Sequence, residues 1–200
     1  MTQKTSPKAL EIIDQARLLI ANGGYNGFSY ADIAKTLGVT NASIHYHFPA
    51  KADLVKAVVI QYRTYSHHQL ALARAEDDDP VRLLRLFVGF WEHCLREGPW
   101  PFCICVMLAC ELPLIPDAVA DEVQGHFDDL SGWLTEVMAQ GQARGLLELR
   151  AGPKVEARIL MTLVHGSMIS ARAARDPALY GAVAWPALQR LLVGTPNVPT

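Results

Sequence analysis

The hydrophobic pattern of the chain is helical throughout. Apolar residues recur at every third or fourth position over most of the sequence, and no run alternates with the period of two expected for a half-buried strand. We therefore predict an all-α fold of about nine helices. Their expected bounds are about residues 7–22, 30–37, 41–48, 51–75, 80–97, 102–112, 116–143 and 154–174, with a last helix ending near 193 that Pro186 should start or kink.

Capping residues mark several of these helix starts. Ser29 precedes an apolar run with Asp32 three positions later, which is the spacing of a capping box. Thr40 can cap the next helix, and Asp79 with Pro80 combines a capping side chain with proline at the first helical position. The helix at 80–97 carries apolar residues on nearly all sides, so we expect it to be central and buried.

Length and composition favour a globular protein with a small and a larger part. The chain has 200 residues, of which 50% are hydrophobic and 19% charged, and the sharpest change in composition lies near Pro49. We therefore predict one domain at 1–49 and a second at 50–200. A net charge of −2 argues against a protein that coats nucleic acid through bulk electrostatics, although a local DNA-reading surface remains open.

Neither a secretory signal nor a membrane span is visible in the sequence. Residues 1–8 are polar, and the most apolar stretch, residues 100–110, is interrupted by Pro101 and is shorter than the ~20 residues that span a bilayer. The expected location is the cytoplasm.

Three residues have the spacing of a helix-turn-helix. Two helices that cross closely need a small residue at the crossing, a glycine in the turn, and an apolar residue on the second helix facing the core. Ala34, Gly38 and Ile44 stand at these positions. An ordinary helical hairpin would satisfy the same pattern, so these residues alone leave the DNA-binding interpretation open.

A longer motif follows. Residues 43–54 read SIHYHFPAKADL and residues 28–34 read FSYADIA. Together they resemble the helix-turn-helix of the TetR family of bacterial transcriptional regulators over about residues 12–54. The sequence departs from the family pattern at His45, where Tyr is usual, and at Ala50, where a Ser usually caps the following helix. The resemblance implies a repressor that binds operator DNA as a homodimer and is released by a small molecule.

The resemblance and the geometry of the motif assign DNA-binding roles by position. In such motifs the exposed start of the motif's second helix, here the one expected at 41–48, enters the major groove. The starts of the helices expected at 30–37 and 51–75 can bind phosphate through their amides and charge. Base-edge contacts are expected from Asn41, Ala42 and Ser43; phosphate or thymine-methyl contacts from Thr40, His45, Tyr46 and His47; and phosphate binding from Lys51 and the amides around Ser29 and Tyr30. For His45 and His47 the alternative is a solvated or core-edge ring.

The rest of the chain is expected to bind the effector and to form the dimer. Aromatic, Met and Cys residues gather on the inner helices, and although plain core packing must explain most of them, a cavity among some would suit an apolar or aromatic ligand. The residues proposed for this pocket are Phe87, Phe90, Trp91, Cys94, Trp100, Cys103, Met107, Phe127, Met161 and His165. The resemblance implies that the last two long helices pair with those of a second copy, through a stripe that includes Ile159, Leu163, Gly166, Ser167, Ser170, Ala174, Leu188, Leu191 and Leu192.

Four cysteines lie between residues 94 and 110, and we expect thiols in a reducing compartment. Cys103, at a helix start, is the residue of an alternative hypothesis in which thiol oxidation or an electrophile releases the repressor. Buried structural thiols are the simpler interpretation. A cysteine-dependent enzyme using His93, His126 or His165 as base lacks an orienting group, so we predict no catalytic residues, no metal site and no cofactor.

Overall fold

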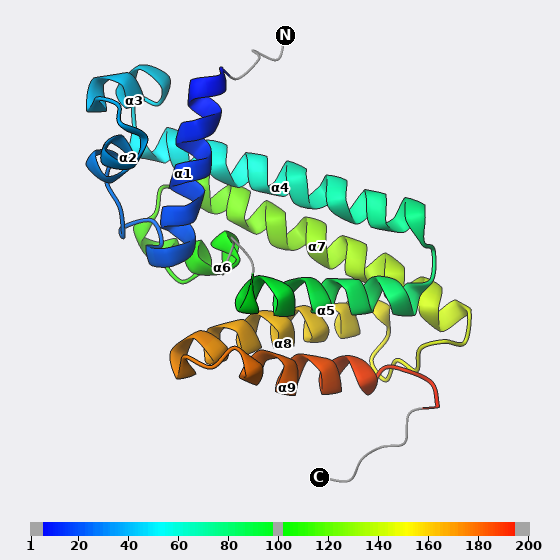
Figure 1. Ribbon diagram of the computed structural model, residues 1–200. Helices are drawn as coiled ribbons and strands as arrows, with labels where there is room; N and C mark the ends of the chain where they lie inside the picture. Colours follow the sequence, from blue (N-terminus) through cyan, green and yellow to red (C-terminus); the bar gives the residue numbers. More distant parts are fainter. Residues whose placement is uncertain (1–5, 98–101, 195–200) are drawn as a thin grey trace. The chain divides into compact units, whose positions relative to one another are not determined.

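The computed structural model describes residues 6–97 and 102–194. Within these residues the secondary structure is helical, apart from one isolated antiparallel bridge between Leu147 and Leu192. Figure 1 shows the helices in chain order: α1 (Pro7–Gly23), α2 (Tyr30–Leu37), α3 (Asn41–His47), α4 (Lys51–Glu76), α5 (Pro80–Arg96), α6 (Ile104–Ala109), the 3-10 turn η1 (Leu112–Leu114), α7 (Asp117–Ala143), α8 (Pro153–Ala174) and α9 (Ala178–Gln189). The all-α prediction is confirmed.

Among the described residues, the first compact unit comprises residues 6–66 and 102–127. It contains α1, α2, α3, α6 and η1, and both α4 and α7 begin in it. Aliphatic residues lie at the centre of its core, where Ile12, Ile20, Ile33, Ile44 and Leu54 are completely buried. This division by compactness does not test the boundary between functional domains that we predict after residue 49, and that boundary stays a prediction.

The second compact unit is built around α5, α8 and α9. Helices α8 and α9 pack side by side (Figure 1), and Tyr180 of α9 is buried with its hydroxyl donating to the Val88 carbonyl oxygen at 2.9 Å. The indole N–H of Trp185 donates to Glu92 at 2.8 Å. These polar contacts from α9 hold it against α5.

One expectation for this unit was wrong, and one alternative of a second is excluded. Helix α5 is amphipathic rather than buried all round, since Leu86 and Phe90 are 51% and 47% exposed. Pro186 lies inside α9, which excludes the alternative that it starts the helix and leaves the predicted kink untested. The ring removes one backbone donor, yet α9 ends only at Gln189, so neighbouring packing outweighs the helix-breaking tendency of the residue.

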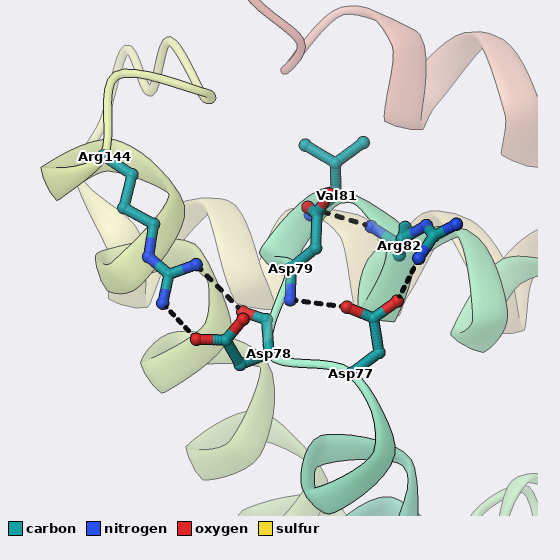
Figure 2. A network of polar contacts seen from close by, with 6 residues as sticks. All are labelled: Asp77, Asp78, Asp79, Val81, Arg82 and Arg144. Atoms are coloured by element: carbon teal, nitrogen blue, oxygen red, sulfur yellow. Dashed lines mark hydrogen bonds and ion pairs between the residues drawn. The ribbon is translucent and has the colours of Figure 1, made fainter.

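Carboxylates organise the loop between α4 and α5 (Figure 2). Asp77 accepts one hydrogen bond from Arg82 at 2.7 Å and another from the backbone N–H of Asp79 at 3.0 Å. Asp78 accepts from Arg144, just after α7, at 2.6 Å, and this bond holds the pKa of the Asp78 carboxyl below its usual value. Asp79 itself caps α5, as predicted.

None of the helices in the described part of the chain is both long and apolar enough to cross a membrane.

Candidate DNA-binding interface

A left-handed glycine makes the turn between α2 and α3. Gly38 has φ 63° and ψ 33°, a conformation that costs glycine little and other residues more. The chain reverses with a hydrogen bond from the Val39 N–H to the Ala34 carbonyl oxygen at 3.1 Å. Ala34 and Ile44 are both buried, Ile44 completely. The three residues singled out by spacing therefore play the expected parts of a helix-turn-helix: Gly38 makes the turn, and Ala34 and Ile44 pack in the core.

Helix α3 presents its first residues to solvent. Thr40 caps the helix, since its hydroxyl oxygen accepts from the Ser43 N–H at 3.2 Å. Asn41 and Ala42 are exposed and Ser43 is half-buried, while Ile44 faces the core. A helix whose exposed face begins at its N-terminus, with its other side anchored, has the form that enters a major groove.

The ring residues that follow differ in their surroundings. Tyr46 is 84% exposed, and its ring meets that of His47 edge to face at 5.2 Å. His45 is exposed, but its Nδ1 lies 3.2 Å from the Pro49 carbonyl oxygen and its ring contacts that of Tyr30. Tyr46 is thus fully available to a ligand such as DNA, whereas His45 also supports the turn after α3.

Helix α2 begins with the predicted capping box. The backbone N–H and the hydroxyl of Ser29 both donate to Asp32 at 2.7 Å, which lowers the pKa of the Asp32 carboxyl. Tyr30 is buried, and its hydroxyl donates to the Phe48 carbonyl oxygen at 2.8 Å. The side chain of Tyr30 is therefore a brace inside the domain, and only its backbone amide can serve the phosphate-binding role expected for it.

Lys51 opens α4 and turns partly inward. Its ammonium group donates to the Phe28 carbonyl oxygen and lies over the rings of Phe28 and Tyr25, 4.1 and 5.0 Å from their centroids. Burial lowers the pKa of Lys51, a shift that the nearby charge of Glu111 opposes. Phosphate binding by Lys51 stays a prediction, and the structure gives this side chain an additional role in packing.

The residues proposed for the effector pocket fall into both compact units. Cys103, Met107 and Phe127 belong to the first unit. In the second unit Phe90 is exposed; the others there are buried or half-buried, namely Phe87, Trp91, Cys94, Met161 and His165. Trp100 lies outside the described residues. The proposed pocket therefore stays a prediction.

Cys103 has polar neighbours, of which sequence reasoning named His126 as a candidate and missed Tyr62. The thiol is completely buried, the Tyr62 hydroxyl donates to its sulfur at 3.5 Å, and Nε2 of His126 lies 4.0 Å from the same atom. Cys94 and Cys105 are also buried free thiols, and Cys110 is an exposed one. Burial raises the pKa of the Cys105 thiol. The described residues include no group of three or more His, Cys, Asp or Glu side chains placed to hold a metal ion.

Two buried polar atoms on α7 also escaped sequence reasoning. The indole Nε1 of Trp133 and the Oε1 of Gln140 have no hydrogen-bond partner among the described residues. The two residues are seven positions apart, about two helical turns, so they share one face of α7. Buried polar groups are nearly always paired in native structures, which makes this pair unusual.

The surface of α8 and α9 corrects part of the predicted dimer stripe. Ser167, Leu188 and Leu191 are buried within the chain and belong to its core. Ile159 and Val183 are exposed apolar residues, on α8 and α9 respectively. An interface on these helices could therefore use the exposed part of the predicted stripe, which includes Ile159, but not these three buried residues.

Comparisons with known proteins agree with this geometry. The profile of bacterial regulatory proteins of the tetR family matches residues 12–58, and that of the tetracyclin repressor-like C-terminal domain matches residues 80–185. A TetR-family regulator from Agrobacterium tumefaciens is 45% identical, with a TM-score of 0.92 over 95% of this chain and 100% of that one. A TetR regulator from Legionella pneumophila, 24% identical over 96% and 100% of the two chains, shares the fold with a TM-score of 0.82.

Among curated proteins, the biofilm operon icaADBC HTH-type negative transcriptional regulator IcaR of Staphylococcus aureus is 23% identical over 130 residues, which are 65% of this chain and 67% of that protein. The two family profiles together span both the helix-turn-helix and the helices from α5 to α9. This chain therefore belongs to the TetR family of transcriptional regulators, which are DNA-binding proteins rather than enzymes.

Proposed function

We propose that this regulator is a repressor that binds operator DNA as a homodimer and is released by a small molecule. The observation that carries the proposal is the surface of α3, where Asn41 and Ala42 are exposed at the helix start while Ile44 is buried. Side chains at the start of a recognition helix reach base edges, and an asparagine there can bond bidentately to adenine. Operator DNA is cytoplasmic in bacteria, and we place the protein there.

The dimer would form through α8 and α9. Val155 and Ile159 are exposed and one helical turn apart on α8, and Val183 is exposed on α9. Such a patch of apolar side chains is costly to leave in water and typical of an interface. A twofold dimer reads two half-sites whose centres lie one helical turn apart, about 34–36 Å.

The effector we propose is a small molecule with an apolar or aromatic body and two polar ends. Trp133 offers an N–H donor and Gln140 an oxygen acceptor, both buried and lacking partners among the described residues. An unpaired buried polar group costs about 1–3 kcal/mol, so a ligand that supplies an acceptor and a donor would be favoured by both residues. The atoms lie on helix turns about 10 Å apart along α7, which suits an elongated molecule.

This part of the proposal can be tested by thermal shift with a panel of hydrophobic aromatic acids, amides and alcohols. A compound that raises the melting temperature of the wild-type protein should do so less in Trp133→Phe, which loses the N–H donor and keeps a ring. The matched control is Trp185→Phe, because the Trp185 N–H is already paired with Glu92. An equal shift in all three proteins would remove Trp133 from the effector site.

A second candidate is release by thiol oxidation at Cys103, and its support is the contact with His126 at 4.0 Å and with Tyr62 at 3.5 Å. A histidine beside a thiol can accept its proton and leave the thiolate that attacks a peroxide, giving sulfenic acid and an alcohol or water. Complete burial of the sulfur works against access. Loss of operator binding on mild peroxide treatment, reversed by a thiol reductant and absent in Cys103→Ser, would favour this candidate over ligand gating.

The proposed function is tested by selecting bound duplexes from a random pool with the full-length protein. We expect enrichment of a site with inverted repeats about one helical turn apart. Failure of any sequence to be enriched over repeated rounds would contradict the proposal.

A further inference from the structure

A carboxylate from outside the helix-turn-helix clasps the turn that precedes it. Glu111 lies just after α6, and its Oε2 accepts the backbone N–H of Tyr25 at 2.5 Å. Its Oε1 accepts both the backbone N–H and the side-chain Nδ2 of Asn26, at 3.3 and 3.2 Å. Three hydrogen bonds therefore join the end of α6 to the turn between α1 and α2, all within the first compact unit.

The turn is shaped for this contact. Gly24 has φ 72°, a conformation that L side chains rarely adopt. A Cβ atom at this position would also overlap the carboxylate of Glu111. The backbone thus leaves room for the carboxylate and points two successive N–H groups at it, an arrangement of amides that favours an anion.

The same turn is also held by the start of α4. The ammonium group of Lys51 lies over the ring of Tyr25 and donates to the carbonyl oxygen of Phe28, the residue just before the capping box of α2. Residues 24–28 are therefore fastened both to α6, through Glu111, and to the start of α4, through Lys51. These residues connect α1 to α2, so their position fixes where the helix-turn-helix begins.

We propose that Glu111 is a positioning residue that fixes the helix-turn-helix on α6 and thereby sets the half-site spacing that the dimer accepts. The inference rests on the proposed function, because spacing has meaning only for a dimer on a two-part operator. Adding one base pair between half-sites increases their separation by about 3.4 Å and rotates one by about 34–36° relative to the other. A rigidly held recognition helix cannot follow that change. Without the clasp, the turn at residues 24–26 keeps fewer contacts and the domain can reorient.

Charge makes this clasp stronger than a neutral contact of the same geometry. Hydrogen bonds from neutral donors to a carboxylate are about twice as strong as those to a neutral acceptor. Glu111→Gln retains one acceptor oxygen of similar shape, so its effect should lie between those of the wild type and Glu111→Ala. An effect that increases from the wild type through Glu111→Gln to Glu111→Ala would show that the hydrogen bonds of this side chain, rather than its bulk, position the domain.

The test uses full-length protein and the duplex that selection from a random pool yields for the wild type. Affinities are measured for this duplex, for versions with the spacer lengthened or shortened by one base pair, and for versions with one base changed inside a half-site. We expect the wild type to lose about tenfold or more on a spacer change, and Glu111→Ala to lose less than about threefold. A base change inside a half-site should cost both proteins equally. Asp121→Asn, which removes an exposed carboxylate from α7 in the same unit, should behave as the wild type.

Outcomes separate this inference from the function on which it rests. A Glu111→Ala protein that keeps the wild-type spacer penalty would overturn the positioning role and leave the repressor assignment intact. Should that variant not fold, Glu111→Gln and Asn26→Ala take its place, since each removes only part of the clasp. The quantity compared with the wild type is again the ratio of the affinities for the original and the altered spacer. If no duplex is enriched by the wild type, the proposed function and this inference fail together.

Discussion

The hydroxyl group of Tyr30 donates a hydrogen bond to the carbonyl oxygen of Phe48, at 2.8 Å. Tyr30 is the first residue of α2, and Phe48 is the C-cap residue that directly follows α3. One buried bond thus joins the outer ends of the two helices of the helix-turn-helix and limits how far they can separate. The orientation of the recognition helix depends on this bond as well as on the turn at Gly38.

Replacing Tyr30 by Phe should destabilise the protein by about 1–2 kcal/mol, because the Phe48 carbonyl loses its donor while the ring is kept. The free energy of unfolding from urea titration measures this. Tyr46→Phe is the control, because Tyr46 is exposed on the neighbouring helix and should change stability little. Equal stability of all three proteins would show that the bond is unimportant.

The same tyrosine predicts a dependence on alkaline pH. Burial, and to a lesser degree the charge of Asp53, raise the pKa of Tyr30 to about 12 from the ordinary value of 10.0. A pKa raised on folding means that the stability contributed by the neutral hydroxyl is fully present below pH 10.0 and declines as pH rises towards about 12. The stability difference between the wild type and Tyr30→Phe should therefore shrink over that interval. A constant difference would contradict the shift.

Helix α4 lacks a capping side chain. The carboxylate of Asp53 accepts the Ala50 N–H at 3.0 Å, which is one half of a capping box, but alanine cannot supply the other half. Ala50→Ser should therefore raise the free energy of unfolding by about 0.5–1 kcal/mol. The same exchange at Ala52, inside the helix, should give no gain, because serine is a poorer helix former than alanine. A larger gain at Ala52 would refute the capping argument.

The proposed dimer interface predicts that a charge placed in it will lower the mass of the protein in solution from that of a dimer to that of a monomer. A glutamate at Ile159 would place a charge in the apolar surface of α8 and oppose association with a like-charged partner. Sedimentation equilibrium should show Ile159→Glu as a monomer at concentrations where the wild type is a dimer. Ile60→Glu changes an equally exposed isoleucine on α4 and should leave the mass unchanged. A dimeric Ile159→Glu protein would place the interface elsewhere.

Much of the helix-turn-helix could be predicted because its determinants are local. The capping box at Ser29, the cap at Thr40 and the left-handed turn at Gly38 each depend on neighbours within four residues. Such short-range hydrogen bonds are visible in the order of the residues. The start of α5 at Asp79 and Pro80 was predictable for the same reason.

Contacts between distant residues could not be predicted. Glu111 meets Asn26 across 85 residues, and His126 approaches Cys103 from a different helix. No periodicity links residues so far apart, so sequence reasoning named three histidines as possible cysteine partners but could not select His126 among them. The same limit applies to α5, where apolar residues on every side gave no indication that Leu86 and Phe90 would face solvent.

The central claim is that the exposed start of α3 reads operator sequence. Its most direct test is competition binding of the double variant Asn41→Ala, Ser43→Ala to the selected operator against the same duplex with scrambled half-sites. The wild type should prefer the operator by a factor of about 1,000 or more. The variant should bind the two duplexes almost equally while keeping wild-type mass and helical circular dichroism. A variant that still discriminates as the wild type does would contradict the claim.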